Sequence, residues 1–172
     1  LAAESGYGSG ANGNITQSAG SSISSGNGGI YIMGGGNVTL NGSVVLASPN
    51  SIGIIAGASA YGDGEATSNG GNVILGGNID AGSGSVNIVA NVGYMSGTNG
   101  NITQYAGSTI LGGNTEIIGG GSIDLAGVVS ASSGQLTVRA GYQLGGYYGN
   151  SGPSANGGNL TISGTLAAQY GV

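Results

Sequence analysis

Few side chains in this sequence could do acid–base or metal chemistry, and they are scattered along the chain. The only base is Arg139, and there is no His, Lys or Cys. The carboxylates are Glu4, Asp63, Glu65, Asp80, Glu116 and Asp124. Glycoside-cleaving sites pair two carboxyl groups about 5–9 Å apart, and acid–base catalysis commonly uses His or Lys. No recurring cluster meets these needs, so we expect no catalytic residue and no enzymatic activity.

Asp63-Gly64-Glu65 is the one place where two carboxylates lie close together in sequence. Ca²⁺ takes roughly six to eight oxygen ligands, and the Gly-Gly-x-Gly-x-Asp repeat of calcium-binding β-rolls does not recur here. A solvated acidic loop is the simpler interpretation. The sequence therefore predicts no metal site and no cofactor.

The composition excludes several classes of binding protein. Charged residues make up 4% of the chain, and the formal net charge is −5. The basic surface that nucleic acids require is absent, as is a polybasic patch for anionic lipid. No apolar run approaches the ~20 residues that cross a bilayer, so we expect no membrane insertion.

Internal repeats determine the elements that hold these residues. Asn12-Gly-Asn-Ile-Thr-Gln17 returns as Asn99-Gly-Asn-Ile-Thr-Gln104, 87 positions later. Gly accounts for 42 residues without the third-position period of collagen. Alternating runs such as Gly29-Ile30-Tyr31-Ile32 indicate ordered strands and not Gly-rich disorder. Self-similarity of this kind is typical of solenoids.

Each smaller repeat reads as three short strands that are closed by Gly-rich corners. The inward pairs of the first strand are Ile15/Gln17, Val38/Leu40, Val73/Leu75, Ile102/Gln104, Ile123/Leu125 and Leu160/Ile162. The second strand centres on Ile23, Val45, Ile79, Ile110, Val129 and Leu166. The third carries Ile30/Ile32, Ile52/Ile54, Val86/Ile88, Thr115/Ile117 and Leu136/Val138. Alternation places each pair on one face, which predicts an all-β fold, a single-stranded parallel β-helix of about six coils.

An Asn precedes the first strand of nearly every repeat. The aligned residues are Asn14, Asn37, Asn72, Asn101 and Asn159, with Ser122 at the remaining position. Stacked coils would bring these side chains together as an amide ladder, as in cross-β structures. Asn14, Asn37, Asn41, Asn101 and Asn159 also fit the Asn-x-Ser/Thr glycosylation pattern. A structural role explains the ladder positions better, which leaves Asn41 as the candidate for a sugar.

Four longer segments follow the third strand: Glu4–Asn12, Gly57–Gly70, Asn91–Asn99 and Gly141–Gly157. Because they share one corner, we expect them to form a single ridge along the rod. The Tyr residues of this ridge are Tyr7, Tyr61, Tyr94, Tyr142, Tyr147 and Tyr148. Tyr-rich loops with Gly and Ser make adaptable contact surfaces, so the ridge could bind glycans or bundle neighbouring fibres. Alternatively, the rings cover the apolar edge of the corner.

We expect residues 1–172 to form one continuous solenoid of two ~86-residue tandem repeats, 12–98 and 99–172, the second continuing into 1–11 of a next copy. Joining Val172 to Leu1 restores a third strand that aligns with the segment starting at Val86. The predicted partners are therefore copies of this chain, joined covalently in an array or stacked head to tail, with lateral bundling a further option. Solenoid ends normally need capping repeats, which favours the covalent array.

The Gly-Asn-(Ile/Val)-Thr openings and the aliphatic-Gly strands resemble the repeat region of filamentous-haemagglutinin-like exoproteins. These are large bacterial adhesins exported by two-partner secretion, and the resemblance covers essentially the whole chain. It implies a right-handed β-helical shaft at the surface of, or outside, a bacterial cell. Of the family's Asn-Pro-Asn-Gly-type secretion motif only Ser48-Pro49-Asn50-Ser51 is similar, so the resemblance is to shaft and carries over no binding residue.

These observations lead to two functional hypotheses. The first is a structural segment of an extracellular fibre, a cell-surface or biofilm-matrix scaffold without catalysis. The second is an adhesin shaft that binds carbohydrate or cells through the Tyr-bearing loops.

Overall fold

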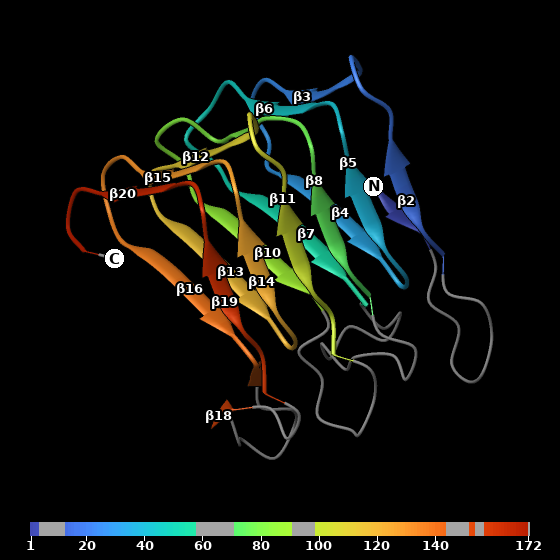
Figure 1. The fold of residues 1–172 in the computed structure, drawn as a ribbon. Helices are drawn as coiled ribbons and strands as arrows, with labels where there is room; N and C mark the ends of the chain where they lie inside the picture. The colour runs from blue at the N-terminus through green and yellow to red at the C-terminus, as the bar shows by residue number, and fades with distance from the viewer. Residues whose placement is uncertain (4–12, 58–70, 91–98, 144–151, 154–156, 172) are drawn as a thin grey trace.

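The computed structural model describes residues 1–3, 13–57, 71–90, 99–143, 152–153 and 157–171, and within these ranges all regular structure is β-strand. Three six-stranded parallel sheets, which we name A, B and C, wrap around one interior (Figure 1). This confirms the parallel β-solenoid of about six coils that the sequence predicts.

Each of the first five coils contributes one strand to every sheet, the sixth adds a strand to sheets B and C, and β1 completes sheet A. Sheet B holds β2 (Ile15–Gln17), β5 (Val38–Leu40), β8 (Val73–Leu75), β11 (Ile102–Gln104), β14 (Ile123–Leu125) and β19 (Leu160–Ile162). Sheet C holds β3 (Ser22–Ser25), β6 (Ser43–Leu46), β9 (Ile79–Asp80), β12 (Thr109–Gly112), β15 (Val128–Ala131) and β20 (Thr165–Ala168). Sheet A holds β1 (Ala2–Ala3), β4 (Ile30–Gly34), β7 (Ile52–Ala56), β10 (Val86–Ala90), β13 (Thr115–Gly119) and β16 (Leu136–Ala140).

Coil 1 is β2–β3–β4, coil 2 is β5–β6–β7, coil 3 is β8–β9–β10, coil 4 is β11–β12–β13, coil 5 is β14–β15–β16, and coil 6 begins with β19 and β20. Parallel strands lie ~4.8 Å apart, so six coils extend roughly 29 Å along the axis. A separate antiparallel pair, β17 (Tyr142–Gln143) and β18 (Gly152–Pro153), lies outside the three sheets.

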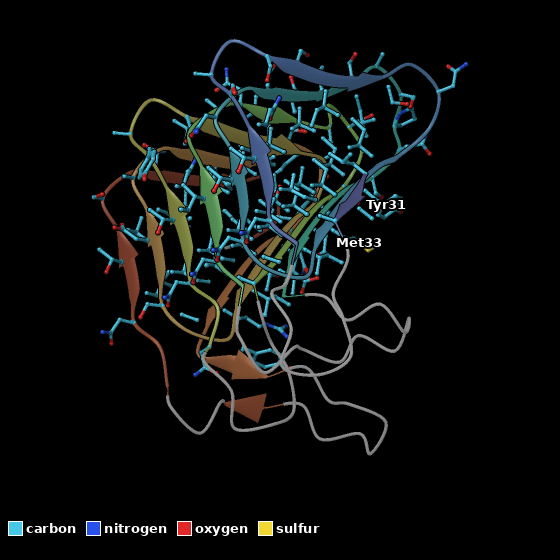
Figure 2. The ribbon with its side chains drawn as sticks, turned by 90° about the vertical axis from the view of Figure 1, so that its right-hand side faces the viewer. Tyr31 and Met33 are labelled. Carbon is cyan, nitrogen blue, oxygen red and sulfur yellow. The ribbon has the colours of Figure 1, made fainter. Side chains whose placement is uncertain are left out.

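The interior is a narrow column of aliphatic side chains (Figure 2). In the central coils the inward residues are fully buried, as Leu40, Ile54, Ile88 and Ile110 illustrate with 0% exposure. Because the strands are in register, each inward side chain packs against the equivalent side chains of the coils before and after it, as Ile54 packs between Ile32 and Ile88. A column this thin is filled by Ile, Val and Leu, so no large aromatic residue is needed.

The inward residues predicted for each strand can be compared with the register of the sheets, residue by residue. The inward pairs predicted for the first and third strands occupy equivalent register positions in sheets B and A. The prediction for the second strand of coil 2 was wrong, because Val44 and not Val45 aligns with Ile23 and Ile79. Val44 is fully buried, whereas Val45 points outward and is 36% exposed.

Glycine is required where the corners of successive coils touch. A Cβ on Gly77 would overlap the carbonyl oxygen of Gly42, and one on Gly164 would overlap that of Gly127. These four glycines precede strands of sheet C, so the backbone there stacks directly on backbone. Gly20 and Gly107 have open space around them, but their φ of 78° and 85° lies in the left-handed region that favours glycine.

Candidate contact surfaces

The described acidic residues do not converge. Asp80 lies on β9 in sheet C, Asp124 on β14 in sheet B and Glu116 on β13 in sheet A. The Oδ1 atom of Asp80 accepts a hydrogen bond from the Gly82 N–H at 2.8 Å, which caps the turn after β9. Across the part of the chain that the structure describes, no group of three or more His, Cys, Asp or Glu side chains could hold a metal ion. Glu4, Asp63 and Glu65 lie outside the described residues.

The predicted Asn positions lie one above another at the corner that precedes sheet B. The Oδ1 atoms of Asn14, Asn37, Asn72 and Asn101 each accept from the backbone N–H at the same position in the next coil. Asn37 donates to Asn14 at 2.7 Å, Asn72 to Asn37 at 2.9 Å and Asn101 to Asn72 at 2.8 Å. The bond is therefore directional: a side chain in one coil holds the main chain of the following coil.

This pattern differs from the amide-to-amide stack expected from the sequence. Among the described residues of the ladder, two side chains are joined only where Asn72 Nδ2 donates to Asn37 Oδ1 at 3.2 Å. Ser122 takes an Asn position without breaking the series, since its N–H donates to Asn101 Oδ1 at 2.8 Å and its Oγ accepts from the Asn159 N–H at 3.2 Å. Asn14, Asn37, Asn101 and Asn159 are exposed, and Asn72 is half-buried.

Asn side chains also join neighbouring coils at the other two corners, but each of these hydrogen bonds connects only two coils. The sequence analysis did not predict them. At the corner before sheet C, the Thr109 N–H donates to Asn78 Oδ1 at 3.2 Å. At the corner before sheet A, the Gln135 N–H donates to Asn114 Oδ1 at 3.0 Å, and Asn50 Nδ2 donates to the Asn27 carbonyl at 2.9 Å. Asn78 and Asn114 directly precede β9 and β13, as the ladder residues precede the strands of sheet B, whereas Asn27 and Asn50 lie three and two residues before β4 and β7 and gave no comparable signal.

Two coils contain a buried amide in place of an aliphatic side chain. Gln17 and Gln104 occupy the inward position that Leu40, Leu75 and Leu125 fill in other coils. Gln104 is fully buried, and its Nε2 donates to the carbonyls of Ser108 and Val128 at 3.3 and 3.1 Å. Gln17 makes the equivalent bonds to Ser21 and Ser43 at 3.3 and 3.0 Å. The Oε1 atom of each has no hydrogen-bond partner.

The outer face of sheet A carries a row of apolar side chains that the sequence analysis did not single out. Met33, Ile55, Val89 and Ile118 occupy the same register position in β4, β7, β10 and β13. Met33 is 40% exposed, whereas Ile118 is only 3% exposed although it lies outside the core cluster. Figure 2 shows Met33 and its neighbour Tyr31 on the outer side of the rod. The signal was the apolar doublet that ends the alternation in each strand, such as Ile54-Ile55 and Ile117-Ile118.

Of the predicted Tyr ridge, one residue lies within the described part of the chain. Tyr142 begins β17, and its ring lies under the guanidinium of Arg139, with 4.9 Å from Cζ to the ring centroid. Arg139 is the register partner of Ile118 in the next coil. The only base of the sequence therefore lies at the end of the apolar row. Tyr7, Tyr61, Tyr94, Tyr147 and Tyr148 lie outside the described residues.

Asn41, the candidate for glycosylation, lies in the corner between β5 and β6. It is half-buried, and a Cβ on Gly76 of the next coil would lie 2.5 Å from its Oδ1. Its side chain therefore packs against the backbone of coil 3, and glycosylation there stays a prediction.

No helix within the described ranges has the length and apolar character to span a bilayer. No protein-family model, no curated protein and no solved structure matches this chain. The geometry of the coils is accordingly the main guide to what the molecule does.

Proposed function

We propose that this chain is a structural segment of an extracellular bacterial fibre, a stiff scaffold without catalysis in which copies of the segment follow one another along the axis. The observation that carries the proposal is the uninterrupted register of six coils. Main-chain hydrogen bonds connect every coil to the next, and the Asn series at one corner adds a side-chain bond at each step. A stack of this kind resists bending because every coil is bonded along three sheets.

The distribution of polar groups supports the same proposal. Coils 1 and 6 contain no charged side chain between residues 13 and 34 or between 158 and 171. The described acidic residues are spread over three sheets, and Arg139 is the only basic residue in the sequence. Such a surface suits a scaffold better than a catalytic groove. The resemblance to filamentous-haemagglutinin-like shafts, read from the Gly-Asn-(Ile/Val)-Thr openings, supports an extracellular, bacterial setting.

Immunogold electron microscopy tests this function directly. Antibodies raised against the folded chain should label extended filaments outside the cells that produce it. Label confined to the cell interior would contradict the proposal. Cleavage of a polysaccharide by the purified chain would contradict the non-catalytic part, and reducing-end assays measure it.

The second function, an adhesin shaft that binds carbohydrate, rests on the Tyr content of the long segments between coils. Glycan-array binding that is lost in Tyr147→Ala and Tyr148→Ala would support it. Tyr105→Ala is the matched control, because Tyr105 is 51% exposed and lies between β11 and β12, outside those segments of the sequence. Equal loss in the control would indicate a general effect of Tyr removal and not a binding site.

A further inference from the structure

The ring of Tyr31 lies along the outer face of sheet A, in a place that two glycines leave open. A Cβ built on Gly53 would lie 2.8 Å from Cδ1 of the ring, and a Cβ built on Gly29 would lie 3.2 Å from Cε2. Because opposite edges of the ring both lie close to main chain, one face of the ring rests on the sheet. The other face points outward, and 58% of the residue is exposed (Figure 2).

Two polar side chains continue from this ring along the same register position, and we name them the polar row. Asn87 in β10 is the register partner of Gly53, and Glu116 in β13 is the register partner of Asn87. Asn87 is exposed and Glu116 is half-buried. Among the described residues, neither side chain has a hydrogen-bond or ion-pair partner. The amide and the carboxylate are therefore free to bind a ligand that lies on the ring.

An aromatic face beside free amide and carboxylate groups suits a sugar. A β-linked pyranose has C–H groups on its flat faces and hydroxyl groups around its edge. Its C–H face can stack on the open side of an aromatic ring, while its hydroxyl groups donate to amide and carboxylate oxygens. The Glu116 carboxylate and the net charge of −5 would repel an acidic polysaccharide. The arrangement therefore favours a neutral glycan.

The direction of the polar row also suits an extended glycan. Three strand spacings separate the strand of Tyr31 from the strand of Glu116, a distance of ~14 Å along the rod. One spacing of ~4.8 Å is close to the length that one pyranose adds to an extended β-linked chain. A glycan that lies along the rod axis with one sugar on Tyr31 would bring the following sugars beside Asn87 and Glu116.

We propose that the outer face of sheet A binds a neutral β-linked glycan, with Tyr31 as the stacking surface and the polar row as its hydrogen-bonding partners. This inference goes beyond the proposed scaffold function, because it gives the rod itself a ligand. It also differs from the adhesin hypothesis, which places carbohydrate binding in the Tyr-bearing segments between coils.

Calorimetric titration of the full chain with cellohexaose tests the site, and retention on microcrystalline cellulose gives a second readout. Tyr31→Ala should weaken binding ~10-fold or more, because it removes the stacking surface. Tyr31→Phe keeps the ring and should stay within ~3-fold of the wild-type affinity. Asn87→Ala should weaken binding ~5-fold through the loss of one hydrogen bond. Tyr105→Ala, at a residue that is 51% exposed, is the control and should bind as the wild type does.

A glycine variant separates a positioned ring from a merely exposed tyrosine. Gly53→Ala puts a methyl group where the ring lies and displaces it, so the affinity should fall ~10-fold although Tyr31 is still present. Gly26→Ala is the matched control, because a Cβ there meets nothing within 4 Å. Circular dichroism of each variant checks that the coils remain folded.

Every outcome bears on the site. Absence of cellohexaose binding, or equal affinities of the wild type and Tyr31→Ala, overturns the proposal. Binding that is lost only in Tyr147→Ala and Tyr148→Ala would assign the sugar to the long segments instead, and tighter binding of polygalacturonate would contradict the selection of a neutral glycan. Filaments that are labelled by antibody but do not bind cellohexaose would refute the site and leave the scaffold function standing. Glycan binding through Tyr31 without extracellular filaments would refute that function and leave the site standing.

Discussion

The ring of Tyr31 covers the α-carbon of Gly53 on the outer face of sheet A. The two residues are register partners in β4 and β7. A Cβ built on Gly53 would lie 2.8 Å from Cδ1 and 3.1 Å from Cε1 of Tyr31, and its three nearest atoms all belong to that ring. An aromatic ring laid over a cross-strand glycine shields backbone that would otherwise face water.

This relationship predicts that the effect of Gly53→Ala changes sign with the residue at position 31. With Tyr31 present, the methyl group displaces the ring, and we expect the free energy of unfolding to fall by ~1 kcal/mol. In a Tyr31→Ala background the methyl group no longer meets the ring, and Ala should raise that free energy by ~0.5–1 kcal/mol because the unfolded chain loses freedom. Urea denaturation of the four proteins gives the coupling energy. Equal effects in both backgrounds would show that the ring does not rest on Gly53.

The Asn series predicts a cost for removing a single acceptor in mid-stack. Asn72→Ala removes the Oδ1 that accepts from Asn101 at 2.8 Å and the Nδ2 that donates to Asn37. We expect the free energy of unfolding to fall by ~1–2 kcal/mol, since the exposed corner allows water to replace part of the loss. Asn87→Ala is the matched control: Asn87 is exposed on sheet A, and no hydrogen bond of its side chain is described. A similar loss in both variants would argue against the series.

Ser122 allows the same idea to be tested in the opposite direction. Its Oγ reaches the Asn159 N–H at 3.2 Å, longer than the 2.7–2.9 Å of the Asn steps before it. Ser122→Asn should supply a better placed carbonyl oxygen and raise the free energy of unfolding by ~0.5 kcal/mol. Hydrogen exchange at the amide of residue 159 should slow in parallel. Unchanged exchange there would contradict the directional bonding inferred for this corner.

The buried amide of Gln104 leads to a prediction of increased stability. Its Oε1 is buried without a partner, a loss that typically costs ~1–3 kcal/mol. Gln104 Nε2 donates to the carbonyls of Ser108 and Val128. The Ser108 carbonyl also accepts from the Val128 N–H at 3.1 Å, and Val128 is paired with Thr109 in the ladder of sheet C, so neither site depends on Gln104 alone. Gln104→Leu should therefore raise the free energy of unfolding by ~1 kcal/mol.

Two comparisons make this prediction specific. Gln104→Ala should instead lower the free energy of unfolding by ~2 kcal/mol or more, because it leaves a cavity in a filled column. Leu125→Gln, at the same position one coil later, should lower it by a similar amount because it buries a new amide. A stability loss in Gln104→Leu would show that the amide has a structural partner that the hydrogen bonds described above do not include.

Much of the fold was predictable because the sequence repeats and the strands alternate strictly. Pairs such as Ile52/Ile54 have one polar or small residue between them, so only one face can be buried. The repeated Gly-Asn opening then fixed which strand follows which. The position of the corner Asn residues was predictable for the same reason, whereas their donors were not, since a residue type reveals the acceptor and not the backbone amide that it meets.

The failures have equally local causes. Ser43-Val44-Val45-Leu46 contains two adjacent Val residues, and either frame of alternation could be buried. Which of the two Val residues points inward depends on the corner at Gly42. The chain there passes so close to coil 1 that a Cβ on Gly42 would overlap the Ser21 carbonyl. The outward apolar row from Met33 to Ile118 was missed because alternation assigns such residues to the solvent side. What covers a residue on that side depends on tertiary packing and not on the period.

Adjacent valines in β6 provide the sharpest test of this register. Val44 is fully buried between Ile23 and Ile79, and Val45 is 36% exposed beside Asp80. Val44→Lys would put an unpaired ammonium group into the aliphatic column, and we expect it to abolish the cooperative unfolding transition or lower its free energy by more than ~4 kcal/mol. Val45→Lys should change that free energy by no more than ~0.5 kcal/mol, since it adds an exposed charge near a carboxylate. Circular dichroism during urea denaturation measures both. If Val45→Lys were instead the more destabilising change, β6 would be shifted by one residue from the register described here, and the assignment of its inward side chains to the core would be wrong.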